Sequence, residues 1–67
     1  MKQSIAAWRK KANMSQTDLA EAIGVSQKAV SAWETCKANP NVESLYKMEK
    51  IFKLNPSDRI LLPKDLI

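Results

Sequence analysis

Apolar residues recur at intervals of three and four positions through much of the chain, which is the spacing of an amphipathic helix. The pattern predicts helices over residues 3–12 and 42–52, with apolar faces formed by Ile5, Trp8, Ala12, Leu45, Met48, Ile51 and Phe52. Asn13 is expected to end the first of these helices, and Asn41 to cap the start of the second. No segment alternates apolar and polar residues over the length of a strand, so the sequence indicates an all-α fold.

Two stretches, "MSQTDL" at residues 14–19 and "VSQKAV" at residues 25–30, follow one template of an apolar residue, Ser, Gln, two variable residues and an apolar residue. Serine is a favoured N-cap, because its hydroxyl accepts a hydrogen bond from the free amides of the first helical turn. We therefore expect short helices to begin at Ser15 and Ser26. The first would end before Gly24, which can adopt a positive φ, and the short connection forces the two helices to cross steeply.

A fifth helix is expected from "NPSD", residues 55–58. Asn55 would cap it, Pro56 suits the first helical position, and Asp58 favours the N-terminal end. This helix would run to about Leu62. The last eight residues, "ILLPKDLI", include five apolar ones, and we expect the tail at 63–67 to form an exposed dimer contact together with the fifth helix.

Length and charge limit the kinds of function. A chain of 67 residues has the size of one domain, residues 1–67, with a small core. The formal net charge is +4, and residues 1–40 carry six Lys and Arg against three Asp and Glu. This excess indicates an anionic partner, with a basic solvated surface as the alternative.

The residue types present argue against catalysis. One cysteine and no histidine leave no disulfide framework within one chain, no usual Cys/His metal site and no histidine to activate a nucleophile. We expect a protein that is not an enzyme and has no cofactor, no metal and no evident small-molecule ligand. Apolar runs are too short for a membrane span and the N-terminus is not a signal peptide, so an intracellular protein is expected.

The spacing of small, glycine and branched residues within residues 16–35 is typical of a helix-turn-helix. Counted from Gln16, Ala20 is fifth, Gly24 ninth and Val30 fifteenth, where a helix-turn-helix requires a small residue, a glycine and a branched apolar residue. The segment "SQTDLAEAIGVSQKAVSAWETCKANP" resembles the helix-turn-helix of the lambda-repressor and Cro-like group, the XRE family, and the similarity extends over about residues 3–62. It implies a compact five-helix domain, duplex DNA as ligand, the third helix in the major groove, and a homodimer on a palindromic operator.

The resemblance also implies which residues contact DNA: Gln16, Thr17, Ser26, Gln27, Lys28, Ser31, Ala32, Lys37 and Asn39. Gln16 would meet the DNA backbone, and Gln27 would reach base edges, since a glutamine amide donates and accepts together as adenine requires. Lys28 would contact a guanine or a phosphate. For the two glutamines, the alternative is that they are ordinary solvated residues at the start of helices.

Other residues are expected to be structural. In this family an arginine and a glutamate at the positions of Arg9 and Glu34 commonly pair and join the first helix to the end of the recognition helix. The helical spacing of Trp8 and Trp33 favours packing in the core over base stacking.

The sequence departs from the family at two positions. Cys36 and Lys53 stand where glycine is common at the end of a helix. A left-handed conformation would strain Cys36, so either the loop there differs or the thiol has a purpose. The thiol could cross-link two subunits, and an exposed inert thiol is the alternative.

These expectations describe a cytoplasmic, nucleoid-associated regulator of prokaryotic or phage origin. The first function expected is that of a Cro-like or phage-type repressor. Alternatives are an antitoxin, a controller of restriction genes, or a protein-interaction module that keeps the fold without binding DNA.

Overall fold

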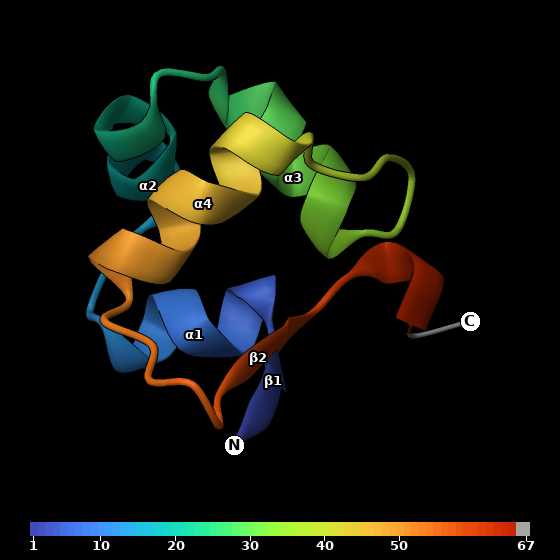
Figure 1. Cartoon of the computed structure of the whole chain (residues 1–67). Helices are drawn as coiled ribbons and strands as arrows, with labels where there is room; N and C mark the ends of the chain where they lie inside the picture. Colours follow the sequence, from blue (N-terminus) through green and yellow to red (C-terminus); the bar gives the residue numbers. More distant parts are fainter. Residues whose placement is uncertain (66–67) are drawn as a thin grey trace.

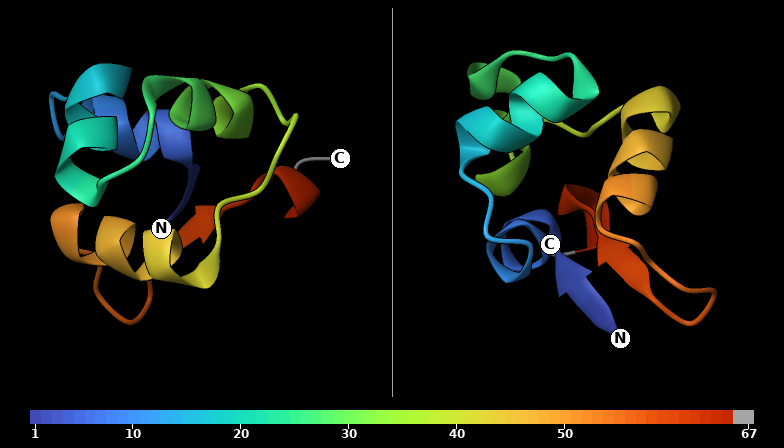
Figure 2. Two further views of the ribbon diagram at one scale, coloured as in Figure 1. Left: turned by 90° about the horizontal axis from the view of Figure 1, so that it is seen from above. Right: turned by 90° about the vertical axis from the view of Figure 1, so that its left-hand side faces the viewer.

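Four α-helices and a small parallel sheet make up the computed structural model, which describes residues 1–65 (Figure 1). In chain order the elements are β1 (Lys2–Ser4), α1 (Ile5–Lys11), α2 (Gln16–Ile23), α3 (Gln27–Glu34), α4 (Val42–Ile51), β2 (Arg59–Leu61) and the 3-10 turn η1 (Pro63–Asp65). Figure 2 shows α4 lying across one side of the group formed by α1, α2 and α3. Among residues 1–65, no helix combines the length and hydropathy needed to cross a membrane.

Each α-helix begins at a side chain that accepts a hydrogen bond from the backbone N–H three residues later. The expected caps are confirmed at Ser15, Ser26 and Asn41, with distances of 3.0, 3.1 and 2.8 Å. The Asp18 carboxylate also accepts a hydrogen bond from the backbone N–H of Ser15, which completes a capping box. Ser4 caps α1 in the same way, so this helix begins at residue 5 and not at residue 3.

The expected fifth helix is absent from the described residues, and that prediction was wrong. Residues 55–58 form a closed turn in which the Asn55 N–H donates to Asp58 Oδ2 at 3.1 Å and the Asp58 N–H donates to the Asn55 carbonyl at 2.9 Å. After this turn the chain becomes β2, which pairs with β1 in parallel, with Gln3 opposite Ile60. Pairing with β1 gives the backbone of this segment its hydrogen-bond partners, and Ile60 is buried in the core.

The core collects apolar side chains from all four helices and from β2. Its buried members are Ile5, Trp8, Leu19, Ala20, Ile23, Val30, Trp33, Met48 and Ile60. Both tryptophans pack inside, as their spacing predicted. Trp8 is stacked near Phe52, with ring centroids 6.5 Å apart, and its Nε1 donates to the Arg59 carbonyl at 3.0 Å, so α1 is tied to β2.

The described part of the tail does not form the expected exposed apolar patch. Ile60 and Pro63 are buried, and Leu61 and Leu62 are half-buried. The dimer contact expected of the tail stays a prediction, since Leu61 and Leu62 remain partly exposed. Residues 66–67, the end of the proposed dimer contact, lie outside the described residues.

A residue with a left-handed backbone follows each of the four α-helices within two residues of its end. Asn13 and Gly24 have φ of 58° and 75°, in agreement with the expectation that they end helices. Cys36 and Lys53, at 62° and 55°, adopt the same conformation without being glycine. The loop at Cys36 therefore keeps the backbone that a glycine would take, and the residue bears the steric cost of its Cβ.

The strain at Cys36 predicts that Cys36→Gly stabilises the protein by about 0.5–1 kcal/mol, because relief of the left-handed penalty exceeds the entropy that glycine adds to the unfolded chain. Urea unfolding followed by circular dichroism measures this change. Lys37→Gly is the matched control, since the φ of Lys37 is not positive and glycine there should give no gain. An unchanged or lowered urea midpoint for Cys36→Gly would show that the backbone is relaxed at this residue.

Candidate nucleic-acid interface

Helices α2 and α3 form a compact crossed pair joined by a short turn (Figure 1). Ala20 is only 3% exposed, and its small side chain lets α3 approach α2 closely. The Val25 N–H donates to the Ala20 carbonyl at 3.0 Å, and Gly24 in the left-handed region turns the chain. Val30 and Trp33 on α3 point into the core. This arrangement is a helix-turn-helix, at the residues where the sequence predicted it.

The other side of this pair is polar. Six of the nine residues expected at DNA are exposed, namely Thr17, Ser26, Gln27, Lys28, Lys37 and Asn39, and three are half-buried, namely Gln16, Ser31 and Ala32. They come from the first turn of α2, the length of α3, and the loop that follows α3. Among residues 1–65, no hydrogen bond joins the side chains of Lys37 and Asn39 to the glutamines.

A run of hydrogen bonds connects the starts of α2 and α3 to the end of α3. Gln27 Nε2 donates to Gln16 Oε1 at 2.6 Å, and Gln16 Nε2 donates to Glu34 Oε1 at 3.0 Å. Arg9 on α1 binds the same carboxylate with two hydrogen bonds, donating from Nε to Oε2 at 2.7 Å and from Nη2 to Oε1 at 3.1 Å. We refer to Arg9, Glu34, Gln16 and Gln27 as the glutamine network.

The ion pair at the base of the glutamine network is largely withdrawn from solvent. The side chains of Arg9 and Glu34 are 11% and 8% exposed, and Arg9 Nη1 also donates to the Met14 carbonyl at 2.8 Å. The hydrogen bond with Glu34 raises the pKa of Arg9. Burial acts to raise the pKa of Glu34, but hydrogen bonds from Arg9 and Gln16 and the charges of Arg9 and Lys10 together lower it. Both groups are therefore charged at neutral pH.

The hydrogen bonds that join the two glutamines to each other and to Glu34 could not be predicted from the sequence. Gln16 and Glu34 lie at opposite ends of the helix-turn-helix segment, and only the crossing of α2 and α3 brings them together. The one available signal was the matching position of the two glutamines, each the first residue of its helix. Chemically, this surface offers amide donors and acceptors, hydroxyls and lysine, the groups that hydrogen-bond to base edges and phosphates.

Comparisons with known proteins agree with this geometry. The helix-turn-helix family model matches residues 5–58. The chain is 42% identical over 55 residues to the HTH-type transcriptional activator BcrR of Enterococcus faecalis, covering 82% of this chain and 26% of that protein. It is 38% identical over 66 residues to repressor protein C2 of Salmonella phage P22, covering 98% of this chain and 30% of that protein.

A relative of similar length is an uncharacterized HTH-type transcriptional regulator, MJ0272 of Methanocaldococcus jannaschii, 31% identical over 97% of this chain and 98% of that protein. The chain thus spans less than a third of the activator and of the phage repressor, but nearly all of the archaeal regulator. No solved structure matches the chain significantly. The match over residues 5–58, the crossed α2–α3 pair and these relatives show that the chain belongs to the lambda-repressor and Cro-like (XRE) helix-turn-helix family of DNA-binding transcriptional regulators.

Proposed function

We propose that this protein regulates transcription by binding duplex DNA at a specific sequence, with α3 in the major groove. The observation that carries the proposal is the glutamine network. It holds two glutamine amides together on the polar side of the helix-turn-helix, where α3 would meet base edges. A solvated helix start needs no such support from a largely buried ion pair.

The residues divide into two roles. Gln27, Lys28, Ser31 and Ala32 on α3 would face base edges, through amide, ammonium and hydroxyl groups and a methyl contact to thymine. Gln16, Thr17 and Ser26 lie at the helix starts, and Lys37 and Asn39 lie after α3. These five would contact the DNA backbone, which positions the protein on the duplex.

We further propose that two copies bind a palindromic operator. A two-fold dimer on adjacent half-sites would put its recognition helices about 34 Å apart, one turn of DNA. This proposal rests on the family resemblance. The sense of regulation stays open, since one relative is named an activator and another a repressor. The place of action would be the cytoplasm, at the nucleoid.

Selection of bound duplexes from a random pool, at low and moderate salt, tests the function. The Gln27→Ala protein should discriminate between bases about tenfold less well at one position per half-site. This is the size of effect expected when a bidentate contact to a base is lost. Gln3→Ala, a substitution of the same type in β1, is the control and should leave the selected sequence unchanged. If the selection enriches no particular sequence and the protein binds polyanions in general, the proposal is contradicted.

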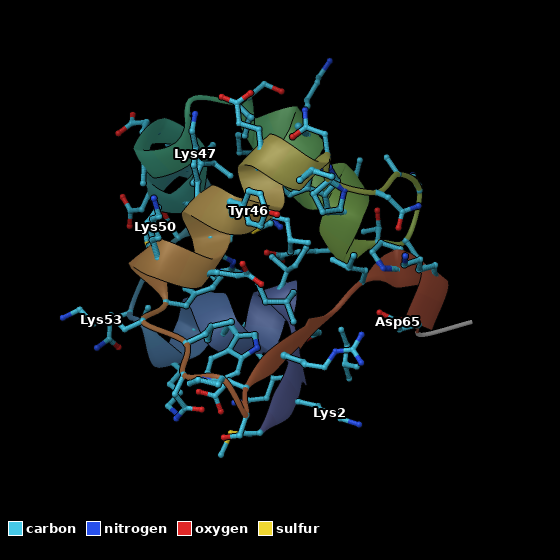
Figure 3. All side chains as sticks on the ribbon, viewed as in Figure 1. Lys2, Tyr46, Lys47, Lys50, Lys53 and Asp65 are labelled. Carbon is cyan, nitrogen blue, oxygen red and sulfur yellow. The ribbon has the colours of Figure 1, made fainter. Side chains whose placement is uncertain are left out.

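One observation favours a second role, contact with a protein partner. Val42 and Tyr46 lie one helical turn apart in α4 and are 64% and 62% exposed. Figure 3 shows Tyr46 on the outer side of this helix. An antitoxin would use such a surface for its toxin while still binding an operator, as a controller of restriction genes also would, and an interaction module would use it without binding DNA. The salt dependence of binding separates the interaction module from the DNA-binding alternatives, because DNA binding weakens with about one power of salt concentration per phosphate neutralised.

A further inference from the structure

The hydrogen bonds of the glutamine network run in one direction, and the chemistry of Glu34 sets that direction. A carboxylate has only acceptor atoms. Gln16 must therefore turn its NH2 group toward Glu34, which it meets at 3.0 Å. Its carbonyl oxygen then faces Gln27 and can only accept, so Gln27 must present its own NH2 group, at 2.6 Å.

We propose that Glu34 is a positioning residue for sequence reading, and that it acts through Gln16 to fix which end of the Gln27 amide points in which direction. The inference rests on the proposed function, since it concerns which base the DNA-bound protein prefers at the position that Gln27 reads. It assigns to Glu34 a role beyond its ion pair with Arg9.

The fixed orientation leaves Gln27 with a defined set of free groups. One of the two N–H groups on Nε2 is held by Gln16, so one N–H and the carbonyl oxygen remain for DNA. Adenine presents an acceptor, N7, beside a donor, N6, and matches this set. Guanine presents two acceptors, N7 and O6, so one of them would face the Gln27 oxygen. The network should therefore favour adenine over guanine at the base that Gln27 reads.

Glu34 is held firmly enough for this role. Its side chain is 8% exposed, and both carboxylate oxygens accept from Arg9, at 2.7 and 3.1 Å. The carboxylate therefore has little freedom to turn away from Gln16. Without the carboxylate, the Gln16 amide has no fixed polarity, because an amide rotated by half a turn fills the same space with donor and acceptor exchanged.

The first test compares wild-type protein with Glu34→Gln on the duplexes that the wild type selects, with adenine or guanine at the position sensitive to Gln27→Ala. Glutamine at position 34 keeps the shape but can offer either a donor or an acceptor to Gln16. The preference for adenine should fall by about fivefold to tenfold at that position alone. Glu43→Gln, the same substitution at an exposed residue of α4, should leave the preference for adenine intact. An equal loss of affinity for every sequence would mean a purely structural role and overturn the proposal.

The second test asks whether the effect passes through Gln16. In a Gln16→Leu protein the connection between Glu34 and Gln27 is already broken. Adding Glu34→Gln should then change the adenine preference by less than about twofold, as expected when two substitutions act on one pathway. A full additional loss in the double variant would show that Glu34 acts by another route and would overturn the proposal.

A third measurement needs no DNA and also reports folding. Side-chain NH2 resonances of Gln27 in the free protein should move on Glu34→Gln, but stay in place when the same substitution is made in Gln16→Leu. Unmoved Gln27 resonances in the first comparison overturn the inference whatever DNA binding is found. Moved resonances in a protein that selects no sequence would support the positioning role and contradict the proposed function instead.

Discussion

Leu19→Ala should leave a large fraction of the protein unfolded at 25 °C. Leu19 is completely buried in the core, on α2, which packs against α3. Removing a buried leucine side chain costs about 2–5 kcal/mol, through lost burial and the cavity left behind. A domain of this length has only about 3–5 kcal/mol of stability from one core, so the substitution removes most of it. Circular dichroism during urea unfolding measures the loss.

Val42→Ala is the matched control for this prediction. It also shortens an aliphatic side chain in a helix, but Val42 is 64% exposed and lies in the first turn of α4. Its free energy of unfolding should change by less than about 0.5 kcal/mol. A Leu19→Ala protein that stays folded with a loss below 1 kcal/mol would mean that the core readily closes around position 19.

The helices could be predicted because their limits are set by neighbouring residues. Ser15, Ser26 and Asn41 each cap a helix through a bond to a backbone amide three residues away, and Gly24 ends one by its own backbone freedom. Such signals lie within one turn of the element that they define, so they can be recognised from the order of residues alone.

The same local signals failed at "NPSD". Asn55 and Asp58 act on nearby amides as capping residues do, but they close a turn instead of starting a helix. Pairing of β2 with β1, at the other end of the chain, determines the outcome, with Lys2 opposite Arg59. A three-residue strand carries too little alternation to be recognised, and its partner is remote in sequence, so neither strand could be predicted.

The residues proposed for the site could be named one by one from the sequence, but their hydrogen-bonded network could not. Family resemblance marked Gln16, Gln27 and the pair Arg9 and Glu34 separately. Their connection depends on the angle at which α2 crosses α3 and on the direction of each amide, which only the arrangement in space provides. Assigning a base to Gln27 requires that direction. The sequence therefore indicated which side chains are expected to meet DNA, and the structure adds how the Gln27 amide would be oriented.

The second large effect is expected from Arg9→Met, which should lower the free energy of unfolding by about 3 kcal/mol. The substitution keeps most of the aliphatic volume but removes the cation that pairs with Glu34, whose side chain is 8% exposed. Leaving one partner of a buried ion pair uncompensated costs about 3–5 kcal/mol, and the small remaining exposure places the effect at the lower end. Lys10→Met, one residue along on an exposed site, is the matched control and should change stability by less than about 0.5 kcal/mol.

The pH dependence should identify Glu34 as the cause. In the wild type the folded-state pKa of Glu34 is lowered, so its contribution is complete above the unfolded pKa of about 4.3 and is lost as pH falls through the folded value. Without Arg9, burial should raise that pKa, and protonation then relieves the unpaired charge as pH falls from 7. Asp18 and Asp58 also have lowered pKa values, but they act alike in both proteins and cancel in the difference.

Urea unfolding in sucrose, which favours the folded state, measures this pH dependence. The gap in free energy of unfolding between wild type and Arg9→Met should shrink below about pH 5. A gap that stays constant from pH 7 to pH 4 would mean that Arg9 stabilises the fold by packing and by its bond to the Met14 carbonyl, and not through Glu34.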